Sequence, residues 1–180
     1  AALNAVFGHV MDLDDVHNAS ITHLGAVTIP TAIALGQSLK ASGMDVITAV
    51  VSGYEAGARI GEAINPSSYQ YWHTTGAIGA FSSAAAAAKL LSLGEEELVN
   101  ALGSAGTQAA GLWEFLRNGS MSKVLHTANA NLCGIRSARL AALGFTGADT
   151  ILEGDRGFVK ALAPEYKLDC LTKDFGSPYK

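Results

Sequence analysis

Acidic residues and histidines gather near the beginning of the sequence. Asp12, Asp14 and Asp15 are followed by His17 and His23. Asp12 and Asp15 are one helical turn apart, so a helix would place both carboxylates on nearby faces. An imidazole titrates near neutral pH, and a neighbouring carboxylate can hold its ring and tune its pKa. This pattern indicates acid–base catalysis.

Two other interpretations fit the same residues. Asp and His are common ligands of divalent metals, although the pattern DxDDxH matches no zinc or calcium motif. In a purely structural interpretation, Asp14 or Asp15 caps the following segment and the histidines are solvated loop residues. The residues alone leave these three alternatives open.

A serine-rich loop leads into a predicted helix that begins at Lys123. The loop contains Gly119, Ser120 and Ser122, and the first helical turn contains Lys123 and His126. Backbone N–H groups at the start of a helix, beside a cation, favour the binding of a carboxylate. A surface lysine without function would show the same pattern.

His73 is the remaining candidate, and its surroundings are uninformative by themselves. It follows Tyr71 and Trp72, a context in which a lone histidine is more often a core or surface residue than a catalyst. Glycine-rich dinucleotide, P-loop and nucleophile-elbow motifs are all missing. The sequence therefore argues against dinucleotide binding, P-loop chemistry and the α/β-hydrolase fold.

Helical patterns dominate the elements that must position these residues, and strand signals are sparse. The fold class predicted is all-α, a multi-helix bundle. Gly53, Gly57 and Gly61 form a stripe that indicates close packing of a neighbouring backbone. The predicted helices cover residues 1–13, 29–39 with Pro30 in the first turn, 45–64 with apolar residues nearly all round, 73–92, 95–110 and 123–143.

The composition narrows the class of protein. The 180 residues are 49% hydrophobic and carry a formal charge of −4, which is typical of a globular protein. No basic stripe is present, so we expect no nucleic-acid partner. The charge-poor segment 72–88 is too rich in small residues for a membrane span. Two isolated cysteines favour a cytoplasmic setting.

Several long segments, taken in order, resemble the MmgE/PrpD family, which includes 2-methylcitrate dehydratase, cis-aconitate decarboxylase and iminodisuccinate epimerase. The segments are GHVMDLDDVH at 8–17, THLG around His23 with IPTAIALG after it, VSGYEAGARIG at 51–61, YWHTTGAIGAFSSAAAAAKLLSLG at 71–94, GLWEFLRNGSMSKVLHTANA at 111–130 and GFTGADTILEGDRGF at 144–158.

The resemblance implies an active site between a helical domain and a smaller α+β domain, with no metal and no organic cofactor. It implies that residues 1–163 form the core of the helical domain and that 164–180 lead towards an absent C-terminal domain. The missing initial methionine likewise predicts a part of a longer protein. A homodimer through the helical domain is also implied.

The family's catalytic positions map by motif onto Asp12, His23, His73 and Lys123. Supporting substrate contacts are expected from Asp15, His17, Ser122 and His126. The chain departs from the family pattern at Leu24, where a proline is usual, and at Asn129, where a basic residue is usual. The loop between the first two catalytic positions is also one residue longer than in the decarboxylase, so the resemblance does not transfer the substrate of any single member.

The resulting hypothesis is a lyase or isomerase that abstracts or delivers a proton next to a carboxylate of a small di- or tricarboxylate. His73 or His23 would act as base or acid, Lys123 would stabilise the carboxylate and enolate-like intermediate, and Asp12 would orient a histidine. A 2-methylcitrate dehydratase-like activity is favoured. Alternatives are an epimerase or decarboxylase of the same family, a non-catalytic helical dimerisation module, and a metal-dependent lyase.

Overall fold

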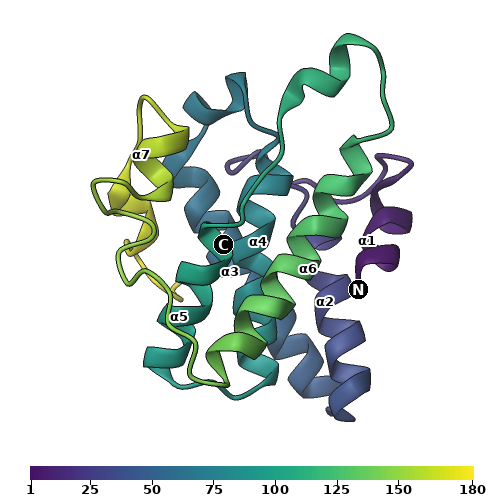
Figure 1. Cartoon of the computed structure of the whole chain (residues 1–180), viewed down its shortest axis with the longest axis vertical. Helices are drawn as coiled ribbons and strands as arrows, with labels where there is room; N and C mark the ends of the chain where they lie inside the picture. Colours follow the sequence, from purple (N-terminus) through teal and green to yellow (C-terminus); the bar gives the residue numbers. More distant parts are fainter.

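The computed structural model describes residues 1–180 and consists of helices and connecting loops, which confirms the all-α prediction (Figure 1). The α-helices are α1 (Ala2–His9), α2 (Leu24–Leu39), α3 (Gly43–Ile64), α4 (Thr74–Leu90), α5 (Glu95–Gly106), α6 (Lys123–Ala141) and α7 (Phe158–Leu162). Three 3-10 helices are η1 (Ser67–Gln70), η2 (Trp113–Arg117) and η3 (Leu168–Leu171). None of the helices combines the length and the apolar character needed to cross a membrane.

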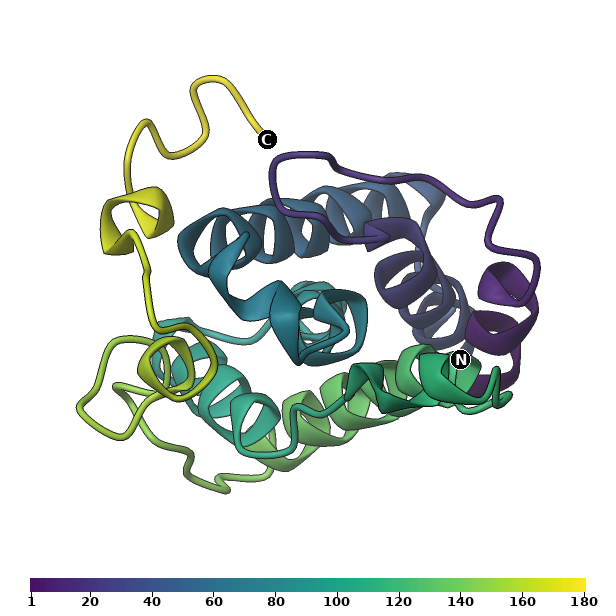
Figure 2. The same ribbon diagram turned by 90° about the horizontal axis from the view of Figure 1, so that it is seen from above.

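Helix α4 lies in the middle of the bundle, where it packs against α2, α3, α5 and α6 (Figure 2). Every residue from Thr74 to Ala88 is buried. Small side chains make this possible, because they let neighbouring helices approach on all sides. Gly79 is one such position, and a Cβ added there would meet both Val27 of α2 and Ala130 of α6. The central helix is therefore a spacer whose small residues set the distances between its neighbours.

The glycine stripe of α3 confirms the predicted close packing. A Cβ added at Gly53 would meet Thr28, and one at Gly57 would meet Ser82. At Gly61 it would meet the backbone and side chain of Ser20. The stripe thus brings α3 against α2, α4 and the loop that precedes α2.

Helix α2 begins at Leu24, five residues earlier than predicted, and Pro30 lies inside it. A proline cannot donate the hydrogen bond that the carbonyl four residues earlier would accept. The side-chain amide of Asn131, in α6, donates to this carbonyl, that of Ala26, at 3.1 Å. Asn131 also accepts a hydrogen bond from Thr31 at 2.7 Å. A buried side chain from another helix therefore replaces the bond that Pro30 removes.

We expect Asn131→Ala to lower the free energy of unfolding by about 2–3 kcal/mol, because it leaves buried polar groups of α2 without partners. Urea unfolding followed by circular dichroism measures this loss. Asn129→Ala, at an exposed position of the same helix, is the matched control and should change stability by less than about 0.5 kcal/mol. Equal effects of the two substitutions would contradict the role given to Asn131.

Helix α1 ends at His9, so the prediction that it continues to residue 13 was wrong. Asp12 has a φ of 55°, in the left-handed region that L residues adopt at an energetic cost and that Asp tolerates better than most. Its N–H donates to the carbonyl of His9 at 3.1 Å. Strained backbone of this kind is concentrated at functional sites.

Helix α3 is less enclosed than predicted. Its second half is buried, but in its first half the side chains of Met44, Ile47 and Val51 are exposed. The prediction of a fully packed helix was therefore wrong for this half. The apolar pattern alone cannot tell a side chain that packs within the chain from one that lies on its surface.

The C-terminal segment folds back onto α3 (Figure 2). Arg59 is buried and pairs with Glu55 at 2.7 Å. Its guanidinium also donates to the backbone carbonyl of Lys173 at 2.7 Å. The division into residues 1–163 and a connection at 164–180 stays a prediction.

Candidate active site

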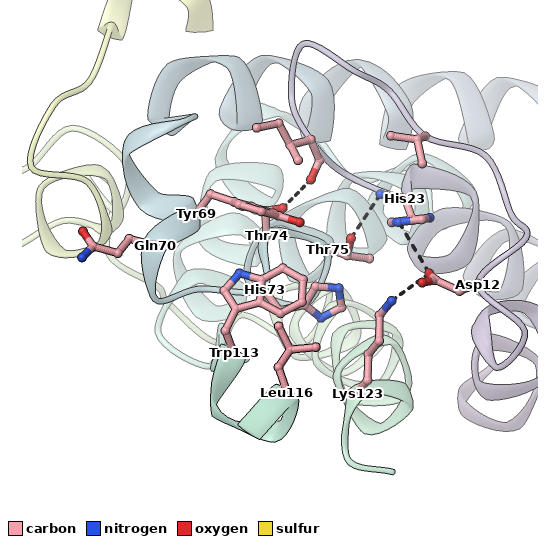
Figure 3. Close-up of a pocket in the computed structure, with 12 residues that line it drawn as sticks. Asp12, His23, Tyr69, Gln70, His73, Thr74, Thr75, Trp113, Leu116 and Lys123 are labelled. Atoms are coloured by element: carbon pink, nitrogen blue, oxygen red, sulfur yellow. Dashed lines mark hydrogen bonds and ion pairs between the residues drawn. The ribbon is translucent and has the colours of Figure 1, made fainter. Parts of the chain in front are cut away.

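A pocket of about 610 Å³ lies where loops and helix ends meet (Figure 3). All four predicted catalytic residues line it: Asp12, His23, His73 and Lys123. The other lining residues are Val16, Ile21, Tyr69, Gln70, Thr74, Thr75, Trp113 and Leu116. Residues from distant parts of the sequence thus share one cavity.

Three helices begin at this pocket. His23 immediately precedes α2, His73 immediately precedes α4, and Lys123 is the first residue of α6. The start of a helix carries a partial positive charge and free backbone N–H groups. The start of α2 is capped by the Asp15 carboxylate, but the starts of α4 and α6, together with the Lys123 ammonium, favour the binding of a negatively charged ligand.

The first turn of α4 fixes the loop that carries His23. The backbone N–H of His23 donates to the hydroxyl of Thr75 at 3.1 Å, and the hydroxyl of Thr74 donates to the carbonyl of Ile21. On the other side of the pocket, the backbone N–H of His73 donates to the carbonyl of Gly111 at 3.0 Å. These bonds hold both histidines on a rigid central helix.

Asp12 and Lys123 form an ion pair at the edge of the pocket. Lys123 Nζ lies 2.7 Å from Asp12 Oδ1, and His23 Nε2 lies 3.8 Å from the same oxygen (Figure 3). The hydrogen bond from the Lys123 ammonium holds the pKa of Asp12 below its usual value. The carboxylate therefore remains ionised, and a cation and an imidazole stand beside it.

His73 is buried among aromatic rings. Its ring centroid lies 4.8 Å from that of Trp113 and 6.2 Å from that of Phe115. Burial, reinforced by His126 and other neighbouring cationic groups, lowers the pKa of His73 to about 3. The imidazole is therefore neutral at physiological pH. His73 Nδ1 and His126 Nδ1 are 2.9 Å apart, so the N–H of one ring donates a hydrogen bond to the nitrogen of the other.

The low pKa of His73 predicts a loss of stability in weak acid. In the unfolded chain a histidine binds a proton below pH 6.5, whereas in the folded chain His73 binds one only near pH 3. The free energy of unfolding should thus fall as the pH drops from 7.5 to 5.5. Urea titrations at these two pH values should show a fall about 1 kcal/mol smaller in His73→Phe than in the unchanged protein. Equal falls would contradict this.

His9 and Asp14 are part of the same cluster, although the sequence did not single out His9. His9 is fully buried, and its Nδ1 lies 3.0 Å from both carboxylate oxygens of Asp14. Its ring centroid is 4.7 Å from that of His23 and 5.8 Å from that of His73. The available signal was spacing, because His9 precedes Asp12 by about one helical turn.

The four residues expected to support substrate binding lie outside this pocket. The Asp15 carboxylate accepts hydrogen bonds from the backbone N–H of Gly25 at 3.1 Å and from the Tyr54 hydroxyl at 2.9 Å, so it caps the start of α2. His17 bonds to Ser20 within its own loop. Ser122 and His126 line a neighbouring cavity of about 720 Å³.

The cluster also contains residue types that bind metals. One ligand atom each from His9, Asp12, Asp14 and His23 lies within 4.8 Å of the others. The Lys123 ammonium, 2.7 Å from Asp12, would repel a divalent ion placed there. The arrangement therefore fits a network of shared protons better than a metal cage.

Comparison with known proteins gives the family. The family model described as the MmgE/PrpD N-terminal domain matches residues 1–171. The chain belongs to the MmgE/PrpD family. A cis-aconitate decarboxylase of Aspergillus terreus is 33% identical over 191 residues, covering 98% of this chain and 39% of the relative. Cis-aconitate decarboxylase of Homo sapiens is 32% identical over 165 residues, covering 88% of this chain and 34% of the relative.

A cis-aconitate decarboxylase-like protein of Aspergillus oryzae is 30% identical over 196 residues, which cover the whole of this chain and 40% of that protein. The chain thus spans about two fifths of the length of the MmgE/PrpD relatives it matches. These relatives are lyases by name.

Proposed function

We propose that the protein containing this chain is a lyase that removes carbon dioxide from a small, unsaturated tricarboxylate such as cis-aconitate. The observation that carries the proposal is the convergence of Asp12, His23, His73 and Lys123 on one pocket. A non-catalytic helical module would have no need to gather these groups. The decarboxylases among the relatives favour this reaction over the dehydration of 2-methylcitrate expected from the sequence.

Binding would begin with the carboxylates of the substrate. Lys123 supplies a full positive charge, and the starts of α4 and α6 add partial positive charges. Asp12 holds the ammonium in place at 2.7 Å and also partly neutralises it. A carboxylate must therefore compete for Lys123, which disfavours weakly charged molecules and favours di- or tricarboxylates.

The chemical step would need both a cation and a proton donor. When the bond between a carboxylate and its neighbouring carbon breaks, carbon dioxide leaves and the electron pair stays on the carbon framework. Lys123 stabilises this developing negative charge. His73 delivers a proton to the carbanion while its Nδ1 takes the proton of His126, whose Nδ1 is 2.9 Å away, and His126 is reprotonated by water from the neighbouring cavity.

Because His73 is neutral, it can give up a proton to the substrate only as it receives the proton of His126. A ring that shares a proton with His126 can present either an N–H or a lone pair to the pocket, depending on which ring holds the shared proton. In a dehydratase or an epimerase the same ring would instead abstract a proton. The decarboxylase proposal therefore rests on the relatives for the choice of reaction and on the geometry for the residues.

A screen of the whole protein in deuterated water tests the proposal. The substrates are cis-aconitate, 2-methylcitrate, citrate and iminodisuccinate, each followed by proton NMR. We expect loss of carbon dioxide from cis-aconitate and one deuterium on carbon in the product. Turnover of 2-methylcitrate alone would instead establish the dehydratase, and turnover of none of the four would overturn the proposal.

We also propose that the protein forms a homodimer through this helical domain. Helices α2 and α3 pack on each other, and both expose apolar side chains, which disfavour contact with water. These side chains are Ile29, Ile33, Met44, Ile47 and Val51. Sedimentation equilibrium measures the mass, and a monomer at micromolar concentration would contradict this proposal.

A further inference from the structure

Asp14 lies behind the pocket and faces two imidazoles at once. Its carboxylate is 3.0 Å from His9 Nδ1 and 3.4 Å from His23 Nδ1. The side chain is only 12% exposed and does not line the pocket, so it is not placed to touch a substrate.

His23 Nδ1 is buried and makes no hydrogen bond, so the Asp14 carboxylate at 3.4 Å acts on this nitrogen through its charge. Asp14 is the only carboxylate within 4 Å of this nitrogen. A lone pair on Nδ1 would point at a negative charge, whereas a proton on Nδ1 would be attracted to it. The surroundings thus favour the tautomer of His23 that carries its proton on Nδ1.

The opposite nitrogen of His23 faces the pocket. Nε2 lies 3.8 Å from Asp12 Oδ1, on the side that Lys123 also reaches (Figure 3). With the proton on Nδ1, Nε2 has a free lone pair and can accept a proton.

We propose that Asp14 is a positioning residue, which fixes the tautomer and orientation of His23 so that Nε2 presents its lone pair to the pocket as a hydrogen-bond acceptor. His9 shares the carboxylate and holds it in place, because its buried Nδ1 bonds to both oxygens of Asp14. Asp14 and Asp12 therefore have different roles. Asp14 sets the protonation pattern of His23, and Asp12 pairs with Lys123. The kinetic consequence of this proposal rests on the proposed function, but the tautomer itself does not.

Nitrogen-15 NMR of the protein labelled in its histidine rings tests the proposal directly, with His23 assigned from the spectrum of His23→Gln. In the unchanged protein at neutral pH we expect the proton of His23 on Nδ1. In Asp14→Ala we expect that preference to be lost. Asp15→Ala is the matched control, because Asp15 caps α2 and does not face His23 Nδ1, so the tautomer should be retained. A proton on Nε2 in the unchanged protein would overturn the proposal, whether or not Asp14→Ala folds.

Steady-state kinetics of Asp14→Ala gives a second readout. We expect kcat to fall about 10- to 100-fold and KM to change little, because Asp14 acts through His23 and not on the substrate. A rise in KM at unchanged kcat would contradict a positioning role. If the NMR shows the Nδ1 tautomer but no carboxylic acid is turned over, the proposed function fails and the tautomer assignment stands.

Discussion

Replacing Lys123 by alanine should lower kcat/KM by about 10²- to 10³-fold, because a charge-stabilising group is lost from the place where negative charge develops. The substitution also leaves the Asp12 carboxylate unpaired in the pocket, where it would repel a substrate carboxylate. Both effects act in the same direction. Initial rates measured over a range of substrate concentrations give the change.

The matched control is Lys160→Ala. Lys160 forms an ion pair with Asp155 at 2.6 Å on the surface, away from the pocket. Its replacement removes an ion pair with nearly the same distance as that between Lys123 and Asp12. Surface pairs of this kind contribute little to stability, and activity should be unchanged. Similar losses in both variants, or near-normal rates in Lys123→Ala, would remove Lys123 from the mechanism.

Replacing His73 by alanine should lower kcat by about 10²- to 10⁴-fold, which is the usual contribution of a positioned acid or base. His73 is buried against Trp113 and His126, so the loss would come from a group held in a fixed orientation. The measurement is kcat at saturating substrate, with circular dichroism to verify that the variant is folded.

A buried control separates chemistry from stability. Ile78→Ala, one turn further along α4, truncates a core side chain and should cost about 2–5 kcal/mol of stability. At low temperature, where it remains folded, it should keep its turnover. If Ile78→Ala and His73→Ala lose activity equally at that temperature, the effect of His73 is structural.

The all-α class and most helix positions followed from the sequence. Alanine-rich helical periodicity and the glycines that end helices can both be read from short stretches of sequence. The start of α2 did not. Pro30 leaves the buried carbonyl of Ala26 without a helical donor, and Asn131, about a hundred residues later, supplies one. No local pattern contains that information.

The family motifs pointed to four of the residues that line the pocket, and their catalytic role stays a prediction. His9 was missed because the predicted helix continued past it, whereas the chain turns after His9 and brings its ring to Asp14. Asp15 was expected to support substrate binding, but its carboxylate turns towards Gly25 and Tyr54. The position of Asp15 in the sequence did not predict the direction in which its side chain points.

Gly79 has a consequence for the range of molecules that the pocket can accept. A methyl group there would lie 3.0 Å from Ala130 Cβ and closer still to Val27, and so would wedge α2 away from α6. His23 stands at the start of α2 and Lys123 at the start of α6. The distance across the pocket between His23 and Lys123 would therefore depend on Gly79, a buried residue that the substrate does not touch.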